Sequence, residues 1–63
     1  MNEKLQQVRK QKKLSQKEAA KLCDMPFRTY QSYELGREPK VSVAFHMASS
    51  LCVKVEEIFN TQV

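Results

Sequence analysis

Apolar residues recur every three or four positions along most of the chain, which is the period of a helix buried on one side. In residues 2–12, Leu5 and Val8 lie three positions apart, and charged or amide side chains fill most other positions. This narrow apolar stripe predicts an amphipathic first helix. Similar stripes predict four more helices, over about residues 16–23, 27–35, 41–51 and 55–59. The pattern therefore predicts an all-α fold, a compact bundle of five short helices.

Local signals mark where the second and third helices begin and end. Ser15 and Glu18 have the spacing of a capping box, in which each side chain bonds the backbone N–H of the other residue. Pro26 fits the start of the third helix, where its missing N–H is not needed. Gly36, the one glycine of the chain, fits the left-handed position that commonly follows a helix. These signals predict two short helices joined by a tight turn within residues 15–35.

The later helices each have an apolar side that predicts part of the core. Tyr30 and Tyr33 lie three positions apart in the third helix, so we expect both rings to point inward and their hydroxyls to reach the surface. The stripe expected to be buried in the fourth helix comprises Ala44, Phe45, Ala48 and Leu51, with Val41 as a further candidate. The apolar residues of the fifth helix are Val55, Ile58 and Phe59.

Length and composition exclude several classes of protein. The 63 residues make one small domain, residues 1–63, with too little scaffold for a deep enzyme pocket. There is no Gly-rich loop, no nucleophile with a matching base and no carboxylate pair with a pocket, so we expect no enzyme. No apolar run is long enough to span a membrane, and the first residues lack the apolar core of a signal peptide. A cytoplasmic location is the expectation.

Three soft metal ligands, Cys23, His46 and Cys52, are scattered along the chain. Their spacing does not match a four-ligand zinc site or a disulfide framework. The cysteines are therefore expected to be two buried free thiols, and His46 a histidine at the surface or at a dimer edge. No metal, cofactor or small-molecule effector is expected.

Positive charge is concentrated in the first two thirds of the chain. Residues 1–40 hold ten Lys or Arg against five Asp or Glu, a net of +5, whereas residues 41–63 hold Lys54 against two glutamates, a net of −1. A small domain with this asymmetry favours a polyanionic partner. On charge alone, a solvated basic helix face is nearly as good an explanation.

Short motifs follow one another at specific spacing, and as a set they identify a family. They are Leu14-Ser15-Gln16, Glu18-Ala19-Ala20, Thr29-Tyr30, residues 33–39, Ala48 to Leu51, and residues 55–59. In this order they resemble the Cro/cI-type, or XRE-type, helix-turn-helix family of lambda-repressor-like regulators. The resemblance covers about residues 5–59. It implies five helices, of which the third enters the major groove of double-stranded DNA and the second lies across the DNA backbone.

The resemblance also implies which side chains face the bases. Arg28 would bind guanine through two hydrogen bonds, or else a phosphate. Phe27 would press on a thymine methyl group, with a place in the core as the alternative. Gln31 would read adenine, and Ser32 shares the outward face of the same helix. A stacking role for the two tyrosines is a weaker possibility than a core role.

Four further residues are implied as phosphate contacts, and two as a structural pair. The phosphate contacts are Gln16, Thr29, Arg37 and Lys40. In the family the glutamine also braces the third helix, although an ordinary exposed glutamine is the alternative here. Arg9 and Glu34 match an arginine and a glutamate that form a partly buried ion pair, which would make Arg9 structural.

A near-palindromic operator requires two copies of such a domain. We therefore expect a homodimer through the fourth and fifth helices, with an interface formed by Met47, Val53, Val55 and Phe59. The alternative is that the fold serves protein–protein interaction, as in an antitoxin or the partner of a regulator. The positive charge of residues 1–40 argues against this alternative, but only weakly.

Overall fold

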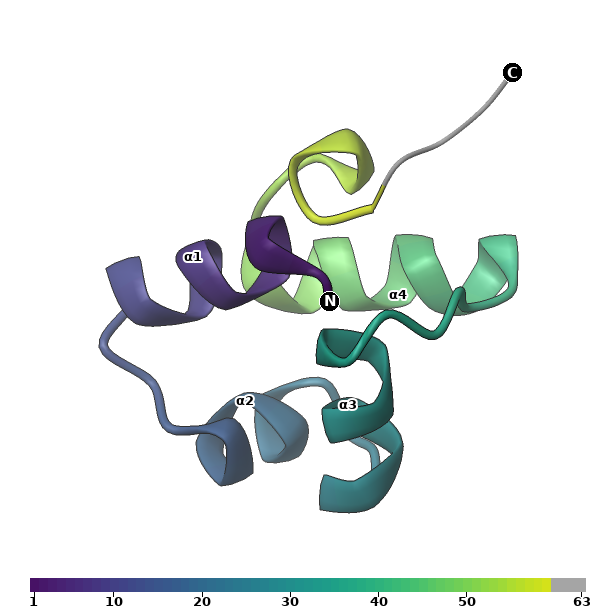
Figure 1. Cartoon of the computed structure of the whole chain (residues 1–63). Helices are drawn as coiled ribbons and strands as arrows, with labels where there is room; N and C mark the ends of the chain where they lie inside the picture. The colour runs from purple at the N-terminus through teal and green to yellow at the C-terminus, as the bar shows by residue number, and fades with distance from the viewer. Residues whose placement is uncertain (60–63) are drawn as a thin grey trace.

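The computed structural model describes residues 1–59 and contains only helices and connecting segments in that range. Four α-helices are followed by a short 3-10 helix, η1 (Figure 1). They are α1 (Glu3–Gln11), α2 (Gln16–Leu22), α3 (Phe27–Glu34), α4 (Val41–Leu51) and η1 (Val55–Glu57). The predicted all-α class is confirmed. No helix in this range is long and apolar enough to cross a membrane.

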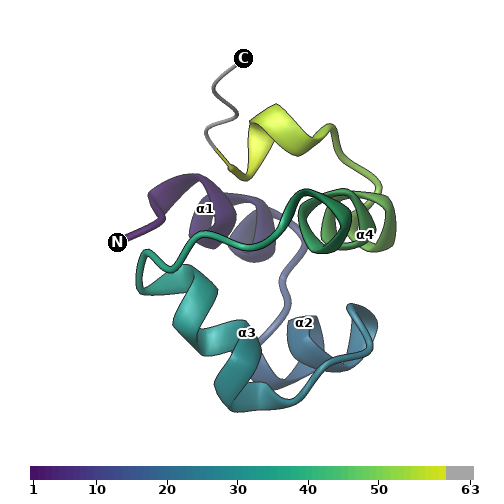
Figure 2. The same cartoon turned by 90° about the vertical axis from the view of Figure 1, so that its right-hand side faces the viewer.

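The helices are arranged in tiers, and the figures show the same order from two sides. α2 and α3 lie together at one end, η1 lies at the other, and α1 and α4 lie between them (Figures 1 and 2). The α-helices are seven to eleven residues long, too short to be stable alone in water. Burial of their apolar sides against one another therefore has to stabilise them.

The predicted fifth helix is present only as the short 3-10 helix η1, so a bundle of five α-helices is not confirmed. The amide of Glu57 donates to the carbonyl of Lys54 at 2.9 Å, and that of Ile58 to Val55 at 3.1 Å, both with three-residue spacing. The Glu57 carboxylate also accepts a hydrogen bond from the Lys54 amide at 2.7 Å. This tight turn already buries Val55, Ile58 and Phe59, so a longer helix is not needed to cover them.

The core collects small and large apolar side chains from every element. Tyr33 and Phe59 meet edge to face, with ring centroids 6.3 Å apart and planes at 84°. Cys23 is buried in this core, and the burial raises the pKa of its thiol to about 11. The core comprises Leu5, Ala19, Ala20, Cys23, Tyr30, Tyr33, Ala44, Met47, Ala48, Leu51, Val55, Ile58 and Phe59. Cys52 lies outside it and is exposed, which corrects the expectation of two buried thiols.

The buried face of α4 differs from the predicted one at two residues. Phe45, expected in the core, points outward, and Met47, not expected there, points inward. Ala44, Ala48 and Leu51 are buried as expected, and Met47 joins them with no exposed surface. These four positions follow the i, i+3, i+4, i+7 pattern of a single helix face. Phe45 is turned away from that face by about 100°. It is 57% exposed, and Val41 is 72% exposed.

The same packing covers most of the side chains that were expected to form the dimer surface. Met47 is fully buried, and Val55 and Phe59 are only 8% and 7% exposed. Val53 is partly buried and packs against the core. The apolar surface of these residues is thus largely covered within one chain, so this set does not form an outward-facing patch.

Left-handed backbone ends several of the helices. Gly36 after α3 has φ 116°, as its position predicts, and the amide of Arg37 donates back to the carbonyl of Ser32 at 3.1 Å. Within residues 1–59, three residues that are not glycine also adopt positive φ, namely Lys13, Asp24 and Cys52, at 58°, 55° and 58°. Side-chain-bearing residues are strained there, and Asp tolerates the conformation best.

Candidate nucleic-acid interface

A capping box begins α2. The Ser15 hydroxyl accepts a hydrogen bond from the Glu18 amide at 3.1 Å, and the Glu18 carboxylate accepts one from the Ser15 amide at 2.9 Å. These bonds from Ser15 lower the pKa of the Glu18 carboxyl below its ordinary value. The box was predicted from the spacing of the two residues, and it aligns Gln16 at the first position of the helix.

The turn between α2 and α3 is held by backbone hydrogen bonds. The Asp24 amide donates to Lys21 and the Met25 amide to Ala20, both at 3.1 Å, while Asp24 takes the left-handed conformation. Pro26 then precedes the first residue of α3 with φ −60° and makes no side-chain cap. Two short helices joined by such a turn form a helix-turn-helix, and the structure places it at residues 16–34.

One side of α3 is buried and the other carries the predicted base-facing residues. Tyr30, Tyr33 and Glu34 form the buried side. Arg28 is exposed at the N-terminal end. The remaining three predicted base contacts, Phe27, Gln31 and Ser32, are partly buried.

Two of these partly buried side chains already have contacts within the chain. The Phe27 ring lies 6.0 Å from the Lys17 ammonium of α2, within range of a cation–π interaction. The Ser32 hydroxyl donates to the Thr29 carbonyl at 2.6 Å. Its proton is therefore engaged within the helix, and only its oxygen lone pairs face outward as acceptors.

The four predicted phosphate contacts are spread over α2, α3 and the segment that follows α3. Gln16 is at the start of α2 and Thr29 in the first turn of α3, both partly buried. Arg37 is exposed after α3, and its guanidinium lies 5.6 Å from the Tyr33 ring centroid. Lys40 is exposed at the N-cap of α4. Each of the two cations reaches solvent from a short segment at the end of α3.

The structure brings Arg9 and Glu34 together although 25 residues separate them in sequence. Arg9 Nε lies 2.7 Å from Glu34 Oε2, and Arg9 Nη1 donates to the Leu14 carbonyl at 3.0 Å. Gln16 Nε2 donates to the other carboxylate oxygen of Glu34 at 3.1 Å. The Glu34 side chain is 1% exposed, so α1, α2 and α3 are tied through one buried carboxylate.

Burial and partners act in opposite directions on the acidity of this carboxylate. Burial alone would raise the pKa of Glu34, but the Tyr30 hydroxyl, Arg9 and Gln16 lower it below its ordinary value. The carboxylate is therefore ionised at neutral pH. Burial, and then the neighbouring Glu34, raise the pKa of Tyr30. Its hydroxyl is buried without a hydrogen bond of good geometry, which corrects the expectation that it reaches the surface.

Two residues that the sequence analysis did not single out as positioning groups hold α2 and α3 in place. The Asn2 amide donates to the Glu34 carbonyl at 2.8 Å, and its side chain donates to the Ile58 carbonyl at 2.6 Å. His46 Nε2 lies 2.9 Å from the Cys23 carbonyl, linking α4 to the turn. Asn is a favoured N-cap, a signal that could have found Asn2. No local signal pairs His46 with a carbonyl 23 residues away.

No group of three or more potential metal ligands forms among residues 1–59.

The two short helices α2 and α3, joined by a tight turn, place the protein in the helix-turn-helix class.

The comparison with protein families agrees with this class. The chain matches the helix-turn-helix family over residues 5–60, most of its length. It belongs to this family, the XRE-type helix-turn-helix proteins, which are Cro/cI-type DNA-binding regulators. The resemblance identified from the sequence motifs is confirmed. A search of curated proteins gave no match.

Proposed function

We propose that this chain is a sequence-specific repressor of transcription, of bacterial or phage origin, in which α3 enters the major groove of double-stranded DNA. The observation that carries the proposal is the two-sided character of α3. Tyr30 and Tyr33 anchor one side in the core, while Arg28 stands exposed at the N-terminal end. The major groove of B-DNA is wide enough for one helix, and its base edges distinguish all four base pairs.

Arg28 is the strongest candidate for reading a base, through two hydrogen bonds to guanine O6 and N7. Gln31 would pair with adenine through its amide, and Phe27 would contact a thymine methyl group from beside Lys17. Ser32 would accept rather than donate, because its proton already binds the Thr29 carbonyl. Its partner on DNA would therefore be an amino group of adenine or cytosine.

The phosphate contacts would fix the register of α3 on the duplex. Gln16 supports this role through geometry, since one N–H binds Glu34 and the amide keeps a second N–H and its oxygen. It would thus join a phosphate to the buried carboxylate at the end of α3. Thr29, Arg37 and Lys40 would bind further phosphates, and each cation would add about one unit to the salt dependence of binding.

The operator would be near-palindromic, with half-sites about 34–36 Å apart, and the protein would bind it as a homodimer in the cytoplasm. Residues 1–63 would act as one domain. Occupancy of an operator that overlaps a promoter would exclude polymerase, so the amount of protein would set the degree of repression.

The proposal is tested by selecting duplexes from a random pool and measuring fluorescence anisotropy on the selected and a scrambled duplex over a salt series. We expect tighter binding to the selected duplex at every salt concentration. Arg28→Ala should weaken that binding about tenfold to a hundredfold and change binding to the scrambled duplex far less. Lys54→Ala removes one charge from the opposite end of the molecule and is the matched control.

Two results would contradict the proposal. Equal binding to both duplexes that disappears at the same salt concentration would leave only a basic surface. Absence of binding at low salt would favour the protein-interaction alternative. In that case Arg28→Glu should leave partner capture unchanged.

A further inference from the structure

The last residue of α3 is held by α1 at two points. The carboxylate of Glu34 meets Arg9 in the last turn of α1, with Arg9 Nε 2.7 Å from Glu34 Oε2. The backbone carbonyl of Glu34 accepts a hydrogen bond of 2.8 Å from the amide of Asn2, which is the N-cap of the same helix. Arg9 follows Asn2 by seven positions, about 10 Å along a helix axis. α1 therefore contacts the end of α3 at two well-separated points.

The carbonyls at the end of α3 show why the bond from Asn2 matters. The last four carbonyls of a helix have no donor within the helix. Those of Gln31, Ser32 and Tyr33 accept from amides that follow directly in the chain. The carbonyl of Glu34 accepts instead from Asn2, at the start of α1. Because Glu34 is 1% exposed, loss of this bond would leave its carbonyl buried without a partner.

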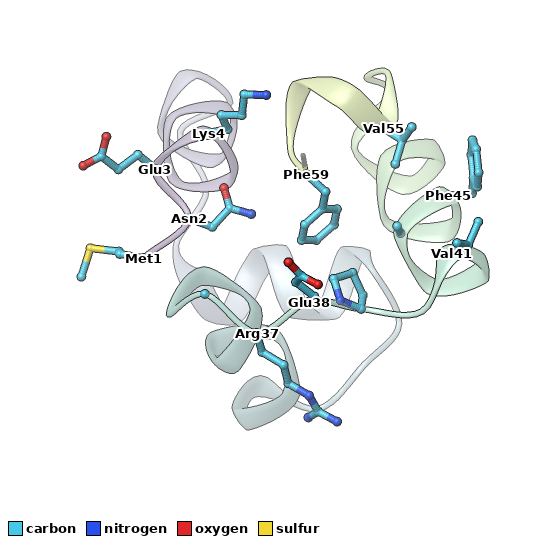
Figure 3. Close-up of a pocket in the computed structure, with 13 residues that line it drawn as sticks. Met1, Asn2, Glu3, Lys4, Arg37, Glu38, Val41, Phe45, Val55 and Phe59 are labelled. Carbon is cyan, nitrogen blue, oxygen red and sulfur yellow. The ribbon is translucent and has the colours of Figure 1, made fainter. Parts of the chain in front are cut away.

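Asn2 is itself fixed in place by its side chain. Its Oδ1 accepts from the Leu5 amide at 3.0 Å and caps α1, while its Nδ2 donates to the Ile58 carbonyl at 2.6 Å. Asn2 lines a groove of about 560 Å³, and Figure 3 shows its amide group pointing from the start of α1 toward Phe59. One residue thus joins α1, α3 and the end of η1.

The turn after α3 leaves room for this contact. Gly36 has φ 116° and no side chain. A Cβ atom at Gly36 would lie 3.3 Å from the backbone nitrogen of Met1, which is tighter than most contacts of a Cβ. A side chain at this position would therefore press the segment before α1 away from the end of α3. Glycine here serves both the left-handed turn and the close approach of residues 1–2.

We propose that Asn2 is a positioning residue for base reading, which fixes the direction of α3 by holding its last carbonyl. Arg28 lies six positions before Glu34, about 9 Å along the helix axis. A tilt of α3 by about 10° around Glu34 would move Arg28 by about 1.5 Å, enough to break a hydrogen bond to guanine. The inference rests on the proposed function, because it concerns how α3 meets DNA.

A chemically synthesised chain with an ester in place of the peptide bond before residue 2 tests this role. The ester removes the amide N–H of Asn2 and keeps its side chain. We expect the affinity for the selected duplex to fall about threefold to tenfold, the effect of one hydrogen bond. The affinity for the scrambled duplex should change far less, because it does not depend on base contacts. Circular dichroism melting confirms that the chain folds.

The matched control is an ester before Leu5 in the same helix. It removes the hydrogen bond that caps α1 and leaves the bond from Asn2 to Glu34 in place. It should lower the melting temperature but keep the ratio of the two affinities. A fall in that ratio as large as in the first ester chain would overturn the positioning role, and so would an unaltered ratio in the first ester chain.

Combination with Arg28→Ala shows whether Asn2 acts through the base-reading residue. In the Arg28→Ala background the ester before residue 2 should weaken binding to the selected duplex less than it does in the unaltered chain, because the contact that it misplaces is already absent. An equal fold-loss in both backgrounds would contradict the proposal.

Residual dipolar couplings separate this inference from the proposed function, because they measure the direction of α3 relative to α1 and α2 without DNA. A changed direction in the ester chain, in a protein that binds no duplex, would support the hold of Asn2 on α3 and refute the proposed function. An unchanged direction would refute the positioning role, and DNA binding by the unaltered chain would then stand by itself.

Discussion

The two ends of the molecule are held together by different kinds of interaction. At the end formed by α1, α2 and α3, Arg9 and Gln16 converge on the buried carboxylate of Glu34. At the end formed by α4 and η1, Met47 and Ile58 are fully buried apolar side chains. Hydrogen bonds are directional, whereas apolar burial is not.

This difference matches the role proposed for each end. The proposed reading of DNA by α3 would require a defined angle between α3 and α2, and a charge-assisted network on Glu34 restricts that angle. The other end needs only to cover its core, so a 3-10 turn serves as well as an α-helix. Apolar packing also leaves one face of α4 free to carry Phe45 outward. Four predictions test how far this division holds.

The largest effect is expected from Arg9→Met, which leaves the Glu34 carboxylate buried without its main partner. Removing one member of a buried pair costs about 3–5 kcal/mol, a large share of the stability of so small a domain. Urea unfolding of the variant should show this loss in the free energy of unfolding. The double variant Arg9→Met/Glu34→Met should recover most of it, because replacing both members leaves no unpaired charge. If Arg9→Met were as stable as the unaltered chain, the ion pair would not hold this end together.

The second effect concerns the apolar end and compares two residues of one helix. Met47→Ala should lower the free energy of unfolding by about 2–5 kcal/mol, because it removes a fully buried side chain and leaves a cavity. Phe45→Ala is the control and should change it by at most about 0.5 kcal/mol in dilute, monomeric protein. Equal losses from the two variants would mean that Phe45 is as buried as Met47, which would contradict the observed packing of α4.

The same pair of residues shows why part of the fold could not be predicted from sequence. Capping signals are local, so Ser15 and Pro26 predicted where α2 and α3 begin. The buried face of α4 depends on which helices pack against it. Phe45 and Met47 are both apolar, and only tertiary packing turns the methionine inward. The burial of Met47 and Phe59, two residues of the predicted dimer interface, could not be predicted for the same reason, since exposure cannot be deduced from hydrophobicity alone.

The candidate site was predictable where a family pattern exists and not elsewhere. The pairing of Arg9 with Glu34 came from the resemblance, because 25 residues of separation carry no local signal. The resemblance indicated that Gln16 braces α3, but not that it does so through the Glu34 carboxylate. It also did not indicate that Asn2 donates to the backbone at the end of α3. These contacts arise only once three helices are packed, and they concern the position of α3 rather than its formation.

The third prediction uses pH to distinguish the two ends. The pKa of Glu34 is lower in the folded chain than its ordinary value of 4.5. Glu34 therefore stabilises the fold above that value, and this contribution is lost as pH falls through the folded-state pKa. Urea unfolding should show that the free energy of unfolding falls from pH 7 to pH 3. This fall should be smaller in the Arg9→Met/Glu34→Met variant than in the unaltered chain. Met47→Ala should keep the full pH dependence. The pKa of Glu18 is also lowered, so Glu18 contributes to the pH dependence that remains in the double variant. Glu18→Gln should remove that contribution.

The smallest effect, and the only increase in the free energy of unfolding, is expected from Cys52→Gly at the end of α4. Cys52 adopts φ 58° and ψ 42°, a left-handed conformation that costs an L-residue about 1–2 kcal/mol. Glycine avoids this strain but loses more backbone entropy on folding, so the net gain should be about 0.5–1 kcal/mol. Cys52→Ala keeps the strained backbone and is the matched control, with no gain expected. Thermal melting under reducing conditions measures both. A gain shared by the alanine variant would assign the effect to loss of the thiol, and α4 would then end without strain.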